Sequence, residues 1–316
     1  MKRLTFIENR YYRPSRMYEV IAKTYGRLRD IPTDVKRKSD FRCAQQVLLA
    51  SGDLAASEKR LVQRLPLKVH RADSMHVQGY ALDYLSAGLS AARCIQAALH
   101  SAGKGDAVGA ILDFPCGYGR VLRFLRAMFP DSDITGGEIQ TAALDFCQRE
   151  FSVTPFLSST DFTSLSLSGK FDVIWCGSLI THIDEQTTAD LLRLFYRHLS
   201  DRGICIFTTH GQRFAQKIKD KKQTYGLSEK GQEKVLCEFQ EKGYGYANYI
   251  NRSGYGISAA SHSRVIELAR SVGTWQQVCY LEHGWDHIQD VYAFAMHTPT
   301  DSVKQDFKPL TLPSYT

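Results

Sequence analysis

The chain has 316 residues, of which 43% are hydrophobic and 23% are charged, a composition that excludes a disordered chain, a collagen and a coiled-coil rod. At about 150 residues per domain, this length predicts two domains, or one domain with additions. No apolar run reaches the ~20 residues of a membrane span, and no apolar stretch follows the basic start MKRLTFIENRYYRPSR, so we expect no secretory signal and a cytoplasmic location.

The formal net charge of +7 is unevenly distributed along the chain. Residues 1–75 carry 17 basic and 8 acidic side chains, residues 212–256 carry 9 and 5, and the remainder has a net charge of −6. Basic regions of this kind fit an anionic partner, such as a phosphorylated metabolite, an acidic glycan, a nucleic acid or a lipid headgroup. They fit a solvated surface without a specific ligand at least as well.

Eight cysteines are spread almost evenly over the sequence, without a C-x-x-C pair. Metal sites need clustered ligands, and disulfide frameworks belong to small secreted chains. Cys176 and Cys205 lie inside apolar runs, where a thiol packs as a small hydrophobic group. We therefore expect free thiols and no metal site.

The first hundred residues predict helices separated by turn residues. Apolar side chains recur at helical spacing, and the last helix closes at Gly103, in the position that glycine favours after a helix. We predict an N-terminal helical cap over residues 1–104, with helical stretches at 16–30, at 43–65 with a break at Ser51-Gly52, and at 76–103.

After the cap, short apolar runs alternate with helical spacing. Such alternation predicts βαβ units and a parallel sheet that is covered on both faces. The predicted strands are 110–114, 133–139, 154–159, 171–178 and 203–211, with helices at 118–129, 141–151 and 184–200. A polar, basic insertion over about 212–256 then precedes a helix at 261–272 and two strand-like runs at 275–283 and 290–297.

A glycine-containing turn follows the first predicted strand and reads DFPCGYGR. Gly117 and Gly119 lack Cβ atoms, so the backbone can approach a ligand at the start of the next helix. Glu138 ends the second predicted strand, 25 residues after Asp113, where an acidic side chain can accept the hydroxyls of a ribose. The turn and the acid together predict a site for a ribose-containing ligand.

Asp161 and Phe162 follow the third predicted strand. A carboxylate and an aromatic ring at this place could hold an adenine, which would complete an adenosine-shaped site. A helix cap with a buried ring explains the same two residues equally well.

Taken in order, these stretches resemble the motif series of class I S-adenosylmethionine-dependent methyltransferases: ILDFPCGYGRVLRFL, GGEI, STDF, FDVIWCGSLITHI and GICIFTTHG, over about residues 105–212. Pro115 departs from the family, whose loop usually has its first glycine there. The resemblance implies an α/β, Rossmann-like fold with a seven-stranded, mostly parallel sheet, an antiparallel C-terminal hairpin, an N-terminal helical cap and an inserted lid. It divides the chain into the cap (1–104), a methyltransferase domain (105–300) and a tail (301–316).

The resemblance further implies S-adenosylmethionine as cofactor and gives roles to the motif residues. Glu138 would hold the ribose, and Ser178 would face the methyl acceptor. The other implied cofactor residues are Asp113, Pro115, Gly117 and Gly119 at the methionine end, Ile139, Asp161 and Phe162 at the adenine, and Cys176 and Gly177 beside the sulfonium.

The residues that could act on the acceptor are suggested only by their positions relative to the predicted strands. An oxygen acceptor usually needs a base near neutral pH, which histidine supplies. His182 follows the fourth predicted strand and His210 ends the fifth, and each could instead be a structural histidine bonded to the backbone. Four aromatic residues are further candidates for binding the acceptor: Tyr80 and Tyr84 on one helix face, Tyr255 in the insertion and Trp285 in the hairpin loop. Alternatively, these side chains only pack between the additions and the main domain.

The sequence thus predicts a methyltransferase that acts by in-line displacement on a small-molecule or glycan-like acceptor. The alternatives are a non-catalytic adenosine-ligand-binding protein of this fold, and a methyltransferase acting on a protein or on RNA ribose. A nicotinamide enzyme is disfavoured because no third glycine follows in GYGRVL, and nucleic acid bases are disfavoured because CGSL replaces the Asn/Asp-Pro-Pro-aromatic signature. The acceptor, the methylated atom and the oligomeric state are left open.

Overall fold

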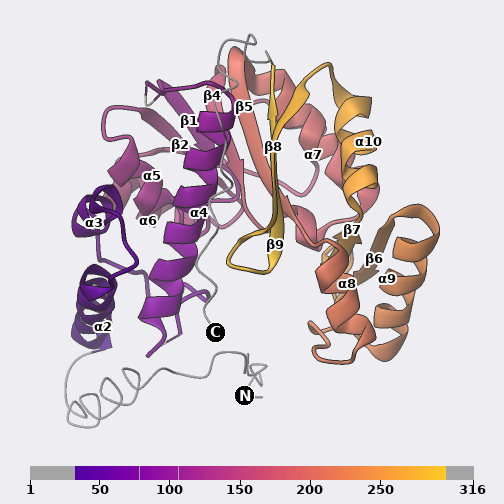
Figure 1. Ribbon diagram of the computed structural model, residues 1–316, viewed down its shortest axis with the longest axis horizontal. Helices are drawn as coiled ribbons and strands as arrows, with labels where there is room; N and C mark the ends of the chain where they lie inside the picture. The colour runs from indigo at the N-terminus through magenta and orange to yellow at the C-terminus, as the bar shows by residue number, and fades with distance from the viewer. Residues whose placement is uncertain (1–32, 78, 106, 297–316) are drawn as a thin grey trace.

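The computed structural model describes residues 33–77, 79–105 and 107–296. Its centre is a seven-stranded sheet in the order β3-β2-β1-β4-β5-β9-β8 (Figure 1). Strands β1 to β5 are parallel, and β9 and β8 form an antiparallel hairpin beside β5, which confirms the predicted fold. The strands are β1 (Ala110–Asp113), β2 (Asp133–Glu138), β3 (Thr154–Leu157), β4 (Phe171–Cys176), β5 (Leu199–Thr209), β8 (Gln276–Trp285) and β9 (Gln289–Ala295).

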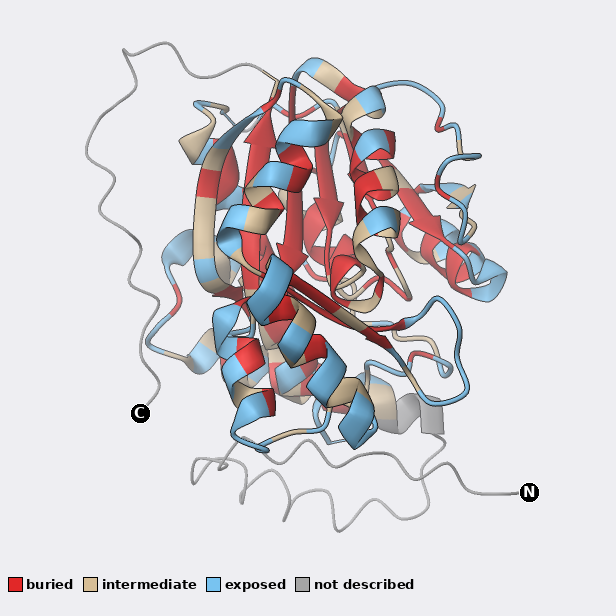
Figure 2. Cartoon of the chain, turned by 90° about the vertical axis from the view of Figure 1, so that its right-hand side faces the viewer, coloured by how far each residue is buried: buried red, intermediate tan, exposed pale blue. Residues whose placement is uncertain are grey.

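Helices cover both faces of the sheet and create one hydrophobic core on each side. Figure 2 shows the strands buried between helices whose outer faces are exposed. One face carries α4 (Ala81–Ser101), α5 (Leu122–Met128) and α6 (Thr141–Phe151), and the other carries α7 (Glu185–His198) and α10 (His262–Val272).

The N-terminal part of the described chain packs on α4 through a core of its own. Helix α2 (Thr33–Ala50) ends and α3 (Ala56–Gln63) begins on either side of Ser51-Gly52, which confirms the predicted break. Gly103 follows α4 with a φ of 63°, in the left-handed conformation that glycine tolerates. The helix predicted over residues 16–30 lies outside the described residues.

The insertion after β5 is more regular than its composition suggests. It contains α8 (Gln212–Lys219), α9 (Glu229–Lys242) and a two-stranded sheet of β6 (Tyr244–Asn248) and β7 (Gly256–Ala260). A separate hydrophobic cluster holds these elements together. The insertion therefore runs to Ala260, four residues beyond its predicted end, and we use this name below for residues 212–260.

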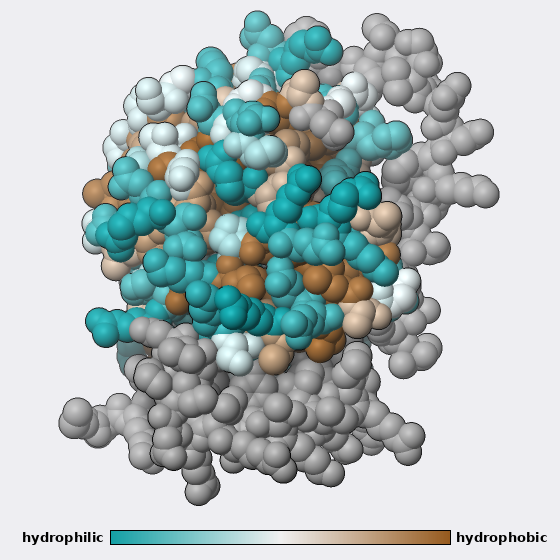
Figure 3. Space-filling model, turned by 90° about the vertical axis from the view of Figure 1, so that its left-hand side faces the viewer, coloured by the Kyte–Doolittle hydropathy of each residue, from teal (hydrophilic) through white to brown (hydrophobic). Residues whose placement is uncertain are grey.

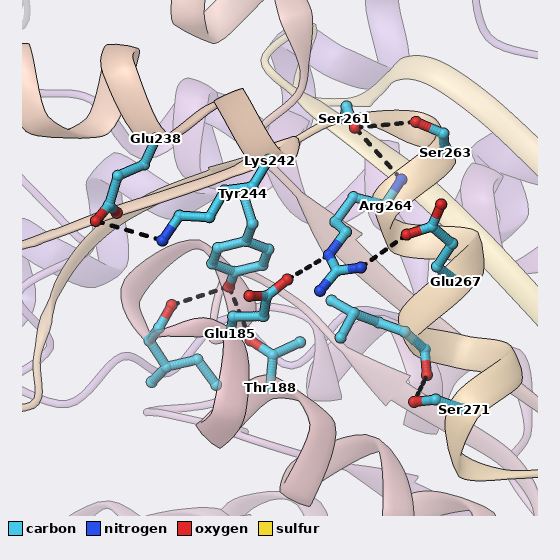
Figure 4. A network of polar contacts seen from close by, with 12 residues as sticks. Glu185, Thr188, Glu238, Lys242, Tyr244, Ser261, Ser263, Arg264, Glu267 and Ser271 are labelled. Carbon is cyan, nitrogen blue, oxygen red and sulfur yellow. Dashed lines mark hydrogen bonds and ion pairs between the residues drawn. The ribbon is translucent and has the colours of Figure 1, made fainter. Parts of the chain in front are cut away.

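Polar contacts attach the insertion to the helices of the main domain (Figure 4). The buried Tyr244 hydroxyl lies 2.9 Å from Thr188 Oγ1 and donates to the Ile183 carbonyl at 3.0 Å. At the start of α10, the Arg264 guanidinium donates to Glu185 of α7 at 2.5 Å and to Glu267 at 2.7 Å. The Tyr244 bonds attach the insertion to α7 and to the residue before its cap, and the Arg264 bonds join α10 to α7.

All eight cysteines are free. No helix in the described part of the chain combines the length and apolar character that a membrane crossing requires. Within the same residues, no group of three or more His, Cys, Asp and Glu side chains could hold a metal ion.

Candidate active site

The loop from β1 to α5 makes a tight turn at the carboxyl edge of the sheet. Its Phe114–Pro115 peptide is cis, and Gly117 and Gly119 have φ angles of 51° and 84°, which favour glycine. A Cβ on Gly117 would meet nothing within 4 Å, whereas a Cβ on Gly119 would lie 2.2 Å from the Phe151 ring. Gly117 thus leaves room for a ligand, and Gly119 allows the turn to pack on α6.

Glu138 lies beside this turn, at the end of β2, and is buried. Its carboxylate accepts the N–H groups of Gly117 at 3.0 Å, Ile139 at 2.8 Å and Gln140 at 3.1 Å. A carboxylate offers about four acceptor positions, so part of its capacity remains for a ligand hydroxyl. Glu138 therefore fixes the turn in addition to standing at the implied ribose position, and Ile139 next to it exposes its side chain.

Asp113 is the last residue of β1, and its side chain is buried. Its Oδ2 atom has no hydrogen-bond partner among residues 33–77, 79–105 and 107–296. Burial first, and the negative charge of Glu138 second, raise the pKa of Asp113 well above its ordinary value. Because an unpaired buried carboxylate is costly, this site favours a bound cation, such as the ammonium group of an amino acid.

Asp161 and Phe162 lie in a turn that no helix follows directly, so Asp161 is not a helix cap, and the adenine contact stays a prediction. The Asp161 carboxylate accepts the backbone N–H and the hydroxyl of Thr163 at 3.0 and 2.5 Å, and these bonds lower its pKa. The Phe162 ring is buried edge-on against Phe114, with centroids 6.0 Å apart. In this conformation the carboxylate caps a turn and the ring packs in the core.

Cys176 and Gly177 stand at the end of β4, beneath Trp285. Burial raises the pKa of the Cys176 thiol, and a Cβ on Gly177 would lie 2.8 Å from the Trp285 ring. Trp285 is itself buried, packs on Trp175 with centroids 5.4 Å apart, and donates its indole N–H to the Ala87 carbonyl at 2.9 Å. Trp285 is thus a buried side chain that covers the end of β4. The sequence had suggested it as a residue that binds the acceptor.

Ser178 continues this edge with a positive φ of 64°. Its N–H donates to Thr208 Oγ1 at 2.9 Å, and its hydroxyl accepts from the Gln289 amide at 2.8 Å. The hydroxyl of Thr208 donates in turn to Gln289 at 2.6 Å. This small network holds the ends of β4, β5 and β9 together.

His182 lies under the tip of the insertion. Its Nδ1 atom is 2.9 Å from the Gly256 carbonyl, and the Tyr249 hydroxyl lies 3.2 Å from the same nitrogen. Because a carbonyl only accepts, Nδ1 carries the proton and Nε2 keeps a lone pair. The Tyr255 ring stacks on the imidazole at 4.9 Å, and burial lowers the pKa of His182.

His210 is held more tightly. It is buried, its Nδ1 is 3.1 Å from the Ser258 carbonyl, and its ring stacks on Phe214 at 3.7 Å. Burial, followed by the nearby His182, lowers the pKa of His210 to about 3. Such a histidine is a weak base and fixes the root of the insertion.

The two tyrosines of the cap do not share a surface. Tyr84 is buried in the cap core and donates to Asp73 at 2.8 Å, whereas Tyr80 is exposed. The prediction of a common face fails because Tyr80 precedes the first helical residue and has non-helical backbone angles. Tyr84 is therefore a packing residue in this structure.

A segment of the cap crosses the glycine turn, which sequence reasoning missed. His70 stacks on Tyr118 of the turn with centroids 4.7 Å apart. Arg123, fully buried in α5, donates to the carbonyls of Gly119 at 3.2 Å, Pro66 at 2.6 Å and Lys68 at 3.3 Å. The only sequence signal was an arginine in an otherwise apolar stretch, since its partners in the cap, Pro66 and Lys68, lie more than fifty residues away.

A groove of about 470 Å³ lies apart from this edge, between α8, α9 and the start of α10, and no residue of the glycine turn lines it. The residues that line this groove include the apolar Leu236 and Phe239 and the basic Lys219, Lys242 and Arg264.

Comparisons with known proteins give one family match and a set of similar solved structures. Residues 111–203 match a family described as "Methyltransferase domain", while curated proteins give no match. Similar solved structures include an S-adenosylmethionine-dependent methyltransferase from Clostridium acetobutylicum (14% identity, 66% of this chain and 91% of that chain, TM-score 0.46). Another is a protein from Pyrococcus horikoshii (16% identity, 70% of this chain and 93% of that chain, TM-score 0.48). A third is magnesium protoporphyrin IX methyltransferase from Synechocystis with bound SAH (10% identity, 83% of this chain and 97% of that chain, TM-score 0.44).

The strand order, the glycine turn and the buried acid at the end of β2 define a class I methyltransferase fold with its cofactor edge. The family match covers β1, the turn, Glu138 and the end of β4. The chain therefore contains a methyltransferase domain over residues 111–203.

Proposed function

We propose that this enzyme transfers the methyl group of S-adenosylmethionine to a small-molecule or glycan-like acceptor at the carboxyl edge of the sheet. The observation that carries the proposal is the unpaired, buried Oδ2 of Asp113 beside a turn that leaves open space at Gly117. The cofactor, when bound, supplies an activated methyl group on a sulfonium.

The chain's own residues would align the reactants rather than supply covalent chemistry. Asp113 would pair with the ammonium group of the cofactor's methionine end, and Glu138 would accept a ribose hydroxyl. The buried Trp285 side chain over Gly177 would keep water from the end of β4. Alignment and exclusion of water are the two contributions that a displacement at a sulfonium requires.

His182 is the stronger of the two candidate bases. Its lowered pKa keeps the imidazole neutral near pH 7, and its Nδ1 proton is committed to the Gly256 carbonyl. The lone pair on Nε2 would then take the proton of an acceptor hydroxyl or ammonium group. His210 lacks this role in the proposal because its ring is enclosed between Phe214 and the Ser258 carbonyl.

The size of the acceptor is inferred from what surrounds the edge. The cap crosses the glycine turn, and the β6–β7 loop of the insertion places Tyr255 on His182. Two coverings of this kind suit a small molecule better than a duplex or a folded protein. A cytoplasmic location stays a prediction.

The test is the fate of labelled methyl groups. The enzyme is incubated with methyl-labelled S-adenosylmethionine and a cell extract, which is then separated by ultrafiltration into small molecules and macromolecules. Label in the small-molecule fraction, lost with His182→Gln and kept with His210→Gln, supports the proposal. Label only on protein or RNA would replace it with the macromolecular alternative.

A further inference from the structure

Large apolar side chains that remain exposed in the described chain all lie at one edge of the molecule. They are Met75, Val77 and Tyr80 before α4, Ile139 and Leu157 at the ends of β2 and β3, Ile250 and Tyr255 in the β6–β7 loop, and Ile288 in the β8–β9 turn. Helix α4 and strand β9 begin at the carboxyl edge, because α4 leads to the start of β1 and β9 is antiparallel to β5.

Single exposed apolar side chains are normal, but they are usually scattered over a surface. Figure 3 shows apolar patches in the middle and lower part of one side of the molecule, above the grey atoms, and smaller patches nearer the top. Ile139 and Leu157 flank Glu138 and fit the adenosine part of the cofactor. The other six come from three segments that would surround the acceptor, and we call them the apolar rim.

The side chain of Arg120 lies beside the β8–β9 turn that carries Ile288 of this rim. The Arg120 guanidinium is 5.4 Å from the centroid of the Trp285 ring, and the same ring lies against Gly177 at the end of β4. Within the part of the chain that the structure describes, Arg120 makes no hydrogen bond or ion pair. Asp286 in the β8–β9 turn interacts with its charge without forming an ion pair within 4 Å.

Arg120 is partly exposed, and its contact with the Trp285 ring leaves the N–H groups of the guanidinium available to a planar anion. A guanidinium binds a carboxylate in a bidentate manner, with geometric specificity that an ammonium lacks. The rim and Arg120 therefore offer two complementary surfaces, one for an apolar body and one for an acidic group.

We propose that the methyl acceptor is an amphipathic anion, whose acidic group pairs with Arg120 and whose apolar body lies against the apolar rim. This inference rests on the proposed function and narrows its substrate class. It also makes glycan-like acceptors without an apolar part poor substrates.

The test uses the full chain saturated with S-adenosylhomocysteine, titrated calorimetrically with butanoate, hexanoate and octanoate, and with octylamine and octan-1-ol as matched head-group controls. Affinity of the carboxylates should rise with chain length, by up to about fourfold for each methylene. Octylamine should bind at least about tenfold more weakly than octanoate, because it cannot pair with a guanidinium.

Variants separate the two halves of the inference. Arg120→Gln should weaken octanoate binding by about tenfold or more and leave octan-1-ol unchanged, whereas Ile288→Asn should weaken both. Arg197→Gln, at the exposed end of α7, is the control and should change neither.

Three results would overturn the inference: octanoate that does not bind the loaded enzyme, octylamine that binds as well as octanoate, or Arg120→Gln without effect. If S-adenosylhomocysteine itself does not bind, the proposed function fails before any carboxylate is added, so the two failures are distinguishable.

Discussion

Asp113 and Glu138 are buried carboxyl groups at the ends of neighbouring strands, yet their surroundings differ. Glu138 accepts three backbone N–H groups, which stabilise a carboxylate. Asp113 has an unpaired oxygen, and its pKa is raised by burial and by Glu138. The difference assigns Glu138 to the framework of the turn as well as to the ligand, and Asp113 to the ligand alone.

Asp113→Asn should stabilise the free enzyme and weaken cofactor binding. A carboxyl group whose folded-state pKa lies above its unfolded value loses stability as the pH rises through that interval, at about 1.4 kcal/mol per unit. At neutral pH the amide should therefore raise the free energy of unfolding, by about 1 kcal/mol or more. Urea denaturation from pH 4 to pH 8 measures this, with Asp131→Asn as the exposed control.

The same residue links cofactor affinity to pH. A bound ammonium group lowers the pKa of Asp113, so binding should release a proton, and affinity should rise with pH up to the free-state pKa. Calorimetry in buffers of different ionisation enthalpy measures the proton release, which Asp113→Asn should abolish. Equal proton release in the variant would assign the effect to another group.

His182 makes a second prediction at this scale. Since burial lowers its pKa, kcat should be flat around neutral pH and fall only on acidification below the ordinary histidine pKa of about 6.5. His182→Gln should lower kcat by about 10²–10⁴ with unchanged S-adenosylhomocysteine affinity. If the fall of kcat on acidification persists in His182→Gln but disappears in His210→Gln, His210 and not His182 is the general base.

At the scale of elements, Arg123 joins the cap to the glycine turn. Arg123→Met should lower the free energy of unfolding by at least about 2 kcal/mol, because the carbonyls of Pro66 and Lys68 lose their donor at this buried side chain. It should also weaken S-adenosylhomocysteine binding, since Arg123 also donates to the Gly119 carbonyl. Lys68→Met is the control, because its exposed ion pair with Glu150 should contribute less than about 1 kcal/mol.

The insertion depends in the same way on Tyr244. Tyr244→Phe removes the donor to the buried Ile183 carbonyl and should cost about 1–3 kcal/mol. Amide hydrogen exchange should then increase over α8, α9, β6 and β7 more than over the main sheet. Tyr246→Phe, which loses only an exposed bond to Asn248, should leave exchange unchanged; equal effects of the two variants would contradict this attachment.

Sequence predicted the elements whose signals are local. Buried parallel strands such as FDVIWC are apolar apart from Asp172, and the helix predicted at 184–200 begins at Asp184, which caps α7 through the Thr187 N–H at 2.8 Å. Strands β6 and β7 were missed because they are rich in Gly and small residues, and because a seven-residue loop separates them without a short turn signal. Their burial comes from α8 and α9, which the strand sequence does not reveal.

The residues of the candidate site also differ in whether the sequence alone could place them. The neighbouring positions of Asp113 and Glu138 were predictable because both residues stand at strand ends, and topology alone brings strand ends together. The burial of Tyr84, the stacking of His210 on Phe214 and the clamp of Arg123 depend on segments distant in sequence. Roles that rest on tertiary contacts were therefore assigned only once the structure was known.

Across the whole molecule, the two edges of the sheet differ in character. The carboxyl edge gathers the exposed apolar side chains, the unpaired Asp113 oxygen and Arg120 without an ion pair, as judged within the described ranges. The cap and the insertion are attached by buried polar contacts to either side of that edge. In the proposed function, the cap and the insertion would frame the space for the acceptor at this edge.

The measurement that tests the central claim most directly is calorimetric binding of S-adenosylmethionine, S-adenosylhomocysteine and NAD to the wild type and to Glu138→Ala. We predict micromolar binding of both adenosyl compounds, weaker binding in the variant, and none of NAD. A folded wild-type protein that binds neither adenosyl compound, or binds NAD equally well, would contradict the assignment of this edge as the cofactor site.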